Sequence, residues 1–188
     1  ALGRPSWFVV APVPLDDGRT AFLAVRFGVE GLNRVLSNPD GGPIELGDTG
    51  ELHLAGPDNR KRSDPRAFRD DPDRYLDDAI AAGTIDTTEA EIIRARGTTA
   101  LVTRTDGDAI AEALTLGGRS SLLERTDHLG RRTLVTATPL DLPGPQWVVV
   151  AQITAEEASA PLDRFRQRLV VLTAILVVAV TFAAMAWA

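Results

Sequence analysis

The C-terminal end of this 188-residue chain is a run of 20 residues, Leu169–Ala188, without a charged side chain. All 46 charged residues (20 basic plus 26 acidic) precede it. At about 1.5 Å per residue, a helix of this length spans the roughly 30 Å hydrocarbon core of a bilayer. A buried core helix is the alternative, but an uninterrupted apolar run at a chain end favours a transmembrane helix. The sequence therefore predicts a membrane protein with a polar head formed by residues 1–168.

Charge and residue usage narrow the classes of partner and chemistry. The net charge is −6, whereas proteins that bind nucleic acid normally have a basic excess, so no nucleic acid is expected as a partner. The absence of cysteine excludes disulfides, thiolate nucleophiles and cysteine-ligated zinc. The two histidines, His53 and His128, lie far apart in the chain without a metal-binding spacing. We expect no metal and no cofactor, and we predict that this chain is not an enzyme.

The first 46 residues predict a hairpin, a short helix and a linker. Apolar runs at 7–11 and 20–27 flank the turn Asp16-Asp17-Gly18, which is typical of paired strands. A helix is expected next, followed by a Pro/Gly-rich linker at 38–43. The helix is predicted to place four apolar side chains on one face: Val29, Leu32, Val35 and Leu36.

The segment from Glu51 to Ile153 predicts one antiparallel sheet with flanking helices. Helices are expected at 72–82, 88–96 and 108–116, the first capped by Asp71 and the second by a Thr88/Glu91 capping box. Strand patterns are found at Glu51–Ala55, Ser120–Thr126, Arg131–Thr138 and Gln146–Ile153. This order is that of a PAS-like module. The predicted fold class is α+β: a PAS-like antiparallel five-stranded sheet with flanking helices, followed by a C-terminal transmembrane helix.

The last strand pattern leads directly into the membrane segment. Thr154 and Glu157 form a capping box, which predicts a helix that runs through Arg168 into the apolar run. Pro161 is expected to kink this helix, because proline lacks the backbone donor and its ring clashes with the carbonyl of Glu157. A strand continuous with a membrane helix is a mechanical connection, which is typical of a sensor.

Two motifs resemble the membrane-proximal module of Cache sensor domains. The first is Gly47–Asp58 (GDTGELHLAGPD) with Arg62–Arg66 (RSDPR) after it, and the second is Pro139–Ile153 (PLDLPGPQWVVVAQI). The resemblance implies that 1–46 is the end of a preceding distal Cache module with its connecting helix. It also implies a membrane-proximal Cache module at 47–153, a juxtamembrane helix at 154–168 and a transmembrane helix at 169–188.

The resemblance also implies a function. Cache domains are extracytoplasmic sensors of bacterial receptors, which implies a protein of the inner or plasma membrane with residues 1–168 outside the cytoplasm. Counted alone, Arg164, Arg166 and Arg168 would favour the opposite orientation.

The motifs are similar to those before adenylate/guanylate cyclases and chemoreceptors, so the implied output is a nucleotidyl cyclase, a chemoreceptor domain or a histidine kinase. The implied partners are a small-molecule ligand, the lipid bilayer and a second copy in a homodimer. The alternative is a membrane-anchored PAS-like structural or partner-binding domain without a ligand.

Six side chains are candidates for binding the ligand: Arg62, Asp64, Arg66, Tyr75, Trp147 and His53. Arg62, near Asp64 and Arg66, is predicted to hold a carboxylate-bearing ligand bidentately at a pocket mouth, the alternative for this basic run being a solvated strand edge. Tyr75 and Trp147 either form the walls of that pocket or pack in the core. His53 is either a strand residue that faces a helix or a pocket ligand and pH sensor. We predict that Arg62, Asp64, Tyr75 and Trp147 line one shared concavity.

Overall fold

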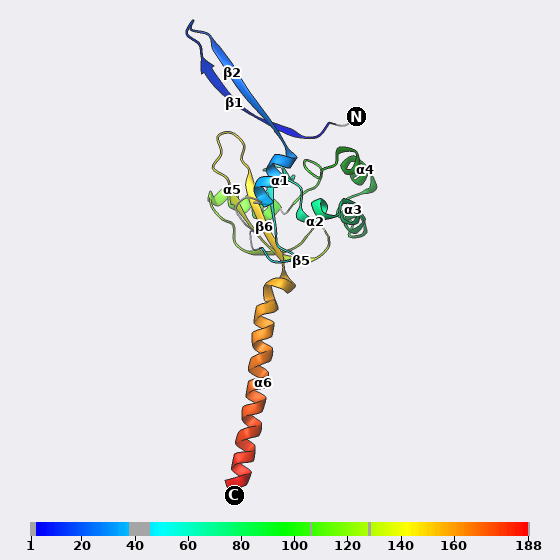
Figure 1. Ribbon diagram of the computed structural model, residues 1–188, viewed down its shortest axis with the longest axis vertical. Helices are drawn as coiled ribbons and strands as arrows, with labels where there is room; N and C mark the ends of the chain where they lie inside the picture. Colours follow the sequence, from blue (N-terminus) through cyan, green and yellow to red (C-terminus); the bar gives the residue numbers. More distant parts are fainter. Residues whose placement is uncertain (1–2, 38–45, 106, 128, 188) are drawn as a thin grey trace.

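The computed structural model describes residues 3–37, 46–105, 107–127 and 129–187. A two-stranded hairpin stands at one end, a mixed α/β body follows, and a long helix projects from the opposite side of the body (Figure 1). The linker predicted at 38–43 and the turn residue His128 lie outside the described residues.

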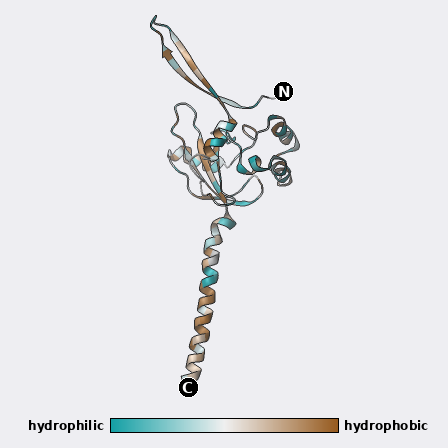
Figure 2. Ribbon diagram, in the orientation of Figure 1, coloured by the Kyte–Doolittle hydropathy of each residue, from teal (hydrophilic) through white to brown (hydrophobic). Residues whose placement is uncertain are grey.

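The N-terminal hairpin extends away from the body. Strand β1 (Ser6–Pro14) pairs antiparallel with β2 (Thr20–Gly28) along its whole length. Apolar side chains of the hairpin are exposed on both strands. In Figure 2, brown stretches mark the hydrophobic residues of the hairpin. At its base, Trp7 packs edge-on against Trp147 with ring centroids 5.7 Å apart, which attaches the hairpin to the body. Both predicted strands are therefore present.

Helix α1 (Val29–Ser37) follows β2 directly, as predicted. Of the apolar face expected for it, only Val29 is buried, and Val35 is mostly exposed. Its strongest connection to the body is polar. The side-chain Nδ2 of Asn33 donates to Asp64 Oδ2 at 2.9 Å, and the side-chain Oδ1 of Asn33 accepts from the Asp64 backbone N–H at 2.8 Å.

The body contains a four-stranded antiparallel sheet in the order β3-β6-β5-β4, so the prediction of five strands was wrong. Its strands are β3 (Glu51–Ala55), β4 (Leu123–Thr126), β5 (Arg132–Pro139) and β6 (Val148–Thr154). Next to β3, only isolated bridges remain where a further strand would lie, between Ala55 and Lys61 and between Arg60 and Arg104. The chain runs back past β3 at this point, where the Arg62 N–H donates to the Leu54 carbonyl, and the Lys61 backbone hydrogen-bonds on its other side to Thr103 and Leu101 of a distant loop.

Four helices flank the sheet: α2 (Arg66–Asp70), α3 (Pro72–Ala81), α4 (Thr87–Arg96) and α5 (Gly107–Leu116). Asp71 caps α3 as predicted by accepting from the Arg74 backbone N–H. The cap of α4 was predicted two residues too late. The sequence contains two overlapping capping-box patterns, and the helix uses the earlier one, formed by Asp86 and Glu89.

Two apolar clusters form the core of the body. One lies between α5 and the sheet and contains Ala109, Ile110 and Ala113 together with small strand residues. The other lies among α2, α3 and α4 and is centred on Tyr75, Leu76 and Ile93. Buried polar residues are numerous as well: Glu51, His53, Lys61, Ser63, Asp64, Thr98, Thr99, Thr103, Ser120, Asp127, Thr133, Gln152 and Thr154.

Helix α6 (Ala155–Trp187) is one unbroken helix that begins directly after β6 and passes through Pro161. At about 1.5 Å per residue it is roughly 50 Å long. Its C-terminal part is long and apolar enough to cross a membrane and is not buried by the rest of the described chain. The hydroxyls of Thr173 and Thr181 donate to backbone carbonyls four residues earlier, so these polar groups are satisfied within the helix.

Candidate ligand-binding site

The inner face of the sheet changes from apolar to polar along its strands. At one end Ala55 lies opposite Val148, and the next pair is His53 opposite Val150. Further along, Glu51 lies opposite Gln152, and beyond it Thr133 lies opposite Thr154. Helix α5 packs on the apolar end. The polar end faces a cavity.

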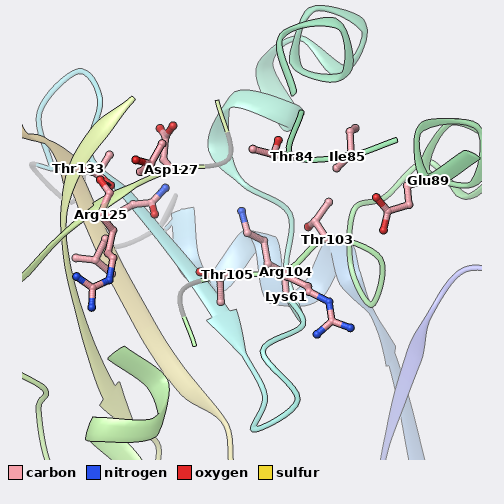
Figure 3. Close-up of a pocket in the computed structure, with 13 residues that line it drawn as sticks. Lys61, Thr84, Ile85, Glu89, Thr103, Arg104, Thr105, Arg125, Asp127 and Thr133 are labelled. Atoms are coloured by element: carbon pink, nitrogen blue, oxygen red, sulfur yellow. Dashed lines mark hydrogen bonds between the residues drawn. The ribbon is translucent and has the colours of Figure 1, made fainter. Parts of the chain in front are cut away.

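This cavity has a volume of about 270 Å³ and is lined by 13 residues (Figure 3). Its sheet side consists of Thr133 and Val135 from β5 and Gln152 from β6. The remaining lining residues come from three loops, from the start of α4 and from β4 with the turn that follows it: Lys61, Thr84, Ile85, Glu89, Thr103, Arg104, Thr105, Arg125, Thr126 and Asp127. Charged and hydroxyl-bearing side chains therefore dominate the lining.

Lys61 is the central charged group of this site. Its side chain is almost fully buried, and Figure 3 shows its amino group directed into the space between the β4–β5 side and the α3–α4 side. Two backbone hydrogen bonds fix its position, from its N–H to the Thr103 carbonyl at 3.0 Å and from the Leu101 N–H to its carbonyl at 2.8 Å. Burial lowers the pKa of Lys61 from its usual 10.5, whereas the nearby carboxylates of Glu51, Asp127 and Asp64 act in the opposite direction.

Asp127 lies across the cavity from Lys61 and closes the turn between β4 and β5. Its Oδ1 accepts from the backbone N–H groups of Leu129 and Arg131, both at 2.8 Å. Its Oδ2 forms an ion pair with the Arg131 guanidinium at 2.8 Å. The Asp127 charge is thus largely offset by Arg131.

Glu51 and His53 lie behind the cavity wall on β3. Glu51 Oε2 accepts from the Gln152 amide at 3.2 Å, and His53 Nε2 is 2.8 Å from the Thr105 hydroxyl. Glu51 Oε1 and His53 Nδ1 are 4.0 Å apart. Burial raises the pKa of Glu51, an effect that the charge of Lys61 opposes. Burial, and then the charge of Lys61, lower the pKa of His53 well below 6.5.

The residues that the sequence indicated at a pocket mouth have structural contacts instead. The Arg62 guanidinium donates to Asp58 at 2.7 Å and to the Arg60 carbonyl at 2.8 Å. Asp64 is buried, and its Oδ1 accepts from the Thr98 hydroxyl and from both the N–H and the hydroxyl of Thr99. Neither Arg62 nor Asp64 lines the cavity.

The other candidates are also separated from one another. Tyr75 packs edge-on against Phe68 at 5.4 Å within the α2–α4 cluster, and burial raises its pKa. Trp147 packs against the hairpin, and Arg66 is exposed beside the Gly47 carbonyl. The shared concavity expected for Arg62, Asp64, Tyr75 and Trp147 is therefore not formed by the described residues. Of the six candidates, His53 reaches the cavity wall, through Thr105.

A second feature joins the start of β3 to the start of α6. The Glu157 carboxylate accepts hydrogen bonds from the backbone N–H groups of Asp48 and Thr49, both at 2.7 Å, and from the Thr49 hydroxyl. These hydrogen bonds lower the pKa of Glu157. Gly47 has φ +75°, and a Cβ there would lie 2.1 Å from Glu157 Oε1, so this close approach requires glycine.

The expected Thr154/Glu157 capping box is consequently only half formed. The Glu157 N–H donates to Thr154 Oγ1 at 3.4 Å. The return hydrogen bond is missing, because the Thr154 N–H donates to Thr49 Oγ1 at 3.2 Å and the Glu157 carboxylate binds the 46–50 loop. We call this arrangement of Asp48, Thr49, Thr154 and Glu157 the β3–α6 clamp.

Comparison with known proteins gives distant structural neighbours. No family model matches the sequence, and no curated protein matches it. Among solved structures, the chain is similar to the ligand-binding domain of the Pseudomonas aeruginosa PAO1 amino acid chemoreceptor PctB, in complex with L-Arg (12% identity, TM-score 0.42) and in complex with L-Gln (13% identity, TM-score 0.42). Both matches cover 86% of this chain but 49% and 53% of the neighbours. The chain thus spans about half the length of these structures, and no residue role is transferred from them.

Proposed function

We propose that this chain is the extracytoplasmic sensor part of a bacterial transmembrane receptor and that it binds a small carboxylate-bearing ligand at Lys61. The observation that carries the proposal is a nearly fully buried lysine directed into a cavity of about 270 Å³. Small-molecule sites usually combine a concave surface with a few polar groups that fix the ligand. The volume lies slightly below the range of about 300–1,000 Å³ typical of drug-sized ligands, which favours a small metabolite.

The charges of the lining favour an anion. Lys61, Arg104 and Arg125 contribute positive charge, and Glu89 and Asp127 contribute negative charge. Two of these groups are paired with residues outside the lining, Arg125 with Asp108 and Asp127 with Arg131. Five threonines also line the cavity: Thr84, Thr103, Thr105, Thr126 and Thr133. The hydroxyls of Thr84, Thr103 and Thr133 donate to backbone carbonyls. A carboxylate can accept both from an ammonium group and from hydroxyls. Arg62 donates to Asp58 and to the Arg60 carbonyl and does not line the cavity, whereas its neighbour Lys61 does.

Signal transfer would follow the strand that forms the cavity wall. Gln152 lines the cavity, and β6 ends two residues later where α6 begins. The β3–α6 clamp gives a second connection, because β3 carries Glu51 and His53. A ligand can shift the helix only by its differential affinity for two helix positions, typically about 1–3 kcal/mol.

The finer parts of the proposal rest on the resemblance of Gly47–Asp58 and Pro139–Ile153 to Cache domains. They are a membrane-proximal Cache module at 47–153, a homodimer, location in the inner or plasma membrane, and a cytoplasmic output such as a nucleotidyl cyclase, a chemoreceptor domain or a histidine kinase. A helix that is long and apolar enough to cross a membrane supports this arrangement.

The binding proposal is tested with the full chain in lipid nanodiscs and a panel of small carboxylates that includes formate, acetate and lactate. We expect calorimetry to detect binding to the wild type, and the Lys61→Met variant to lose it. Arg62→Met is the matched control, because it removes the adjacent positive charge outside the cavity and should leave the affinity unchanged. Equal affinity of the Lys61→Met variant would contradict the site. Absence of binding to the wild type would favour the partner-binding alternative.

A further inference from the structure

Two buried polar atoms face each other behind the cavity wall, and neither has a hydrogen-bond partner within the described part of the chain. They are Glu51 Oε1 and His53 Nδ1, which are 4.0 Å apart. The side chains are 5% and 0% exposed. Buried polar atoms are almost always hydrogen-bonded, so each exception requires an explanation.

The pair is connected to the cavity at both ends. The other carboxylate oxygen of Glu51 accepts from Gln152, and the other ring nitrogen of His53 contacts Thr105. Both Gln152 and Thr105 line the cavity. On each side, a single residue, Gln152 or Thr105, therefore connects the pair to a ligand bound in the cavity.

One additional proton would satisfy both atoms. A separation of 4.0 Å is too long for a hydrogen bond. This arrangement is expected when the imidazole proton is on Nε2, because Nδ1 and Glu51 Oε1 are then both acceptors. An imidazolium would donate from Nε2 to Thr105 and from Nδ1 to Glu51, so that two unpaired acceptors would become one ion pair.

The charges around the pair determine when that proton binds. These charged and titratable groups come from three places: Lys61 and Asp64 from the loop after β3, Asp127 and Arg131 from the β4–β5 turn, and Tyr75 from α3. After burial, the Lys61 charge is the largest influence on both members of the pair, and it opposes protonation of each. An anion bound beside Lys61 offsets this charge and so favours proton binding.

We infer that binding of an anion at Lys61 is accompanied by uptake of one proton from solvent by the Glu51–His53 pair, so that the sensor responds to the anion and to local acidity together. The proton forms a bond to His53 Nδ1, and this N–H then donates to Glu51 Oε1. The anion adds one negative charge and the proton one positive charge, so the net charge of the site is unchanged. The inference rests on the proposed anion site.

The affinity should therefore depend on pH with a defined sign. Since the bound state holds more protons than the free state, the anion binds more tightly as the pH falls. Uptake of one full proton would change the affinity about tenfold per pH unit, and partial uptake would change it less.

The test is calorimetry on the full chain in nanodiscs, with methanesulfonate and acetate as probes, between about pH 6 and 8, where histidine titrates. Both probes stay ionised in this range, so any proton taken up on binding is bound by the protein and not by the probe. Each titration is repeated in two buffers of different ionisation heat, which gives the number of protons taken up. We expect uptake of up to about one proton per anion for the wild type, with several-fold tighter binding at the acidic end.

Variants locate the proton. His53→Gln can keep a hydrogen bond to Thr105 but cannot titrate, so it should bind anion without proton uptake. Glu51→Gln removes the negative charge that would accept from the protonated imidazole, so it should reduce proton uptake. This variant is the alternative test if His53→Gln does not fold. Lys61→Arg keeps a cation that does not titrate in this range, so uptake should persist.

The outcomes separate the inference from the proposed function. Anion binding without proton uptake overturns the inference and leaves the anion site intact. Loss of uptake in Lys61→Arg, with binding retained, also overturns it, because Lys61 would then be the proton acceptor. If neither anion binds to the wild type at any pH, the proposed anion site fails and the inference fails with it.

Discussion

The two ends of the sheet's inner face come from the same strands but are covered in different ways. At the apolar end, small side chains such as Ala55 and Ala137 let α5 pack through Ala109, Ile110 and Ala113. At the polar end, Glu51 and Gln152 occupy equivalent positions, and loops approach instead of a helix. The comparison shows how one sheet supports two tasks: close apolar packing stabilises one end, and buried polar groups keep a cavity at the other.

The polar end also has more long-range polar connections. Asp64 binds Thr98 and Thr99 and is hydrogen-bonded to Asn33 of α1, and Lys61 is fixed by the backbone of the 101–103 loop. These contacts position the cavity wall without filling the cavity. Changes at the apolar end should therefore alter stability, and changes at the polar end should alter binding.

The largest expected effect is on stability at the apolar end. Ile110→Ala removes a fully buried side chain from the inner face of α5, which should lower the free energy of unfolding by about 2–5 kcal/mol through lost burial and a new cavity. Urea unfolding followed by circular dichroism measures it. Leu116→Ala, on the exposed part of the same helix, should change stability by less than about 0.5 kcal/mol. Equal effects of the two substitutions would remove the distinction between packed and exposed faces of α5.

The second prediction makes the polar end apolar. Lys61→Met alone leaves Glu51 buried without the cation that most favours its charged form, so the free energy of unfolding should fall by about 1–3 kcal/mol. The double variant Lys61→Met/Glu51→Gln removes both charges and should be at least as stable as the wild type. Urea unfolding of both variants tests this, and the double variant should still fail to bind anion. A double variant less stable than Lys61→Met alone would show that the two charges do not compensate each other.

Local patterns were enough to predict most elements of the fold. The hairpin, Asp71 as the cap of α3 and the continuous exit helix all depend on residues close together in sequence. The sheet has four strands and not the expected five: beside β3 there are isolated bridges, and the Lys61 backbone is hydrogen-bonded to the 101–103 loop, some 40 residues away. Such pairing is not encoded in the alternation of apolar and polar residues around residue 61.

The site was harder to predict than the fold, for the same reason. Arg62 was selected from the basic run, but its neighbour Lys61 faces the cavity, since the chain turns inward at that position. One signal was available: Lys61 is the single lysine among 20 basic residues. The sequence indicates His53 as a possible pH sensor, but only the structure shows that its Nδ1 faces the carboxylate of Glu51, two residues earlier on the same strand face.

The third prediction concerns the pH dependence of stability, to which His53 at the polar end of the sheet contributes. The pKa of His53 is lowered by burial and then by Lys61, so the folded state excludes a proton that the unfolded state binds below pH 6.5. Its contribution to the free energy of unfolding therefore falls as the pH drops through 6.5, by about 1 kcal/mol one pH unit below. His53→Gln removes this contribution, so its stability should fall less than that of the wild type between about pH 7 and 5.5. Leu116→Ala should keep the wild-type profile, and parallel profiles for wild type and His53→Gln would contradict the buried neutral histidine.

The smallest expected effect concerns the β3–α6 clamp, which joins the polar end of the sheet to the exit helix. Glu157→Gln keeps the size of the side chain but removes the charge that accepts from the Asp48 and Thr49 N–H groups. Charge-assisted hydrogen bonds are stronger than neutral ones, so these two amides should exchange hydrogen faster in the variant. Hydrogen-exchange mass spectrometry of the peptide that contains residues 46–52 measures this.

Glu156→Gln is the matched control, because Glu156 is exposed on the same helical turn. Anion affinity should be unchanged in both variants, since the clamp lies outside the cavity. Unchanged exchange in Glu157→Gln would show that the clamp does not hold the loop, and β6 would then be the remaining path from the cavity to α6.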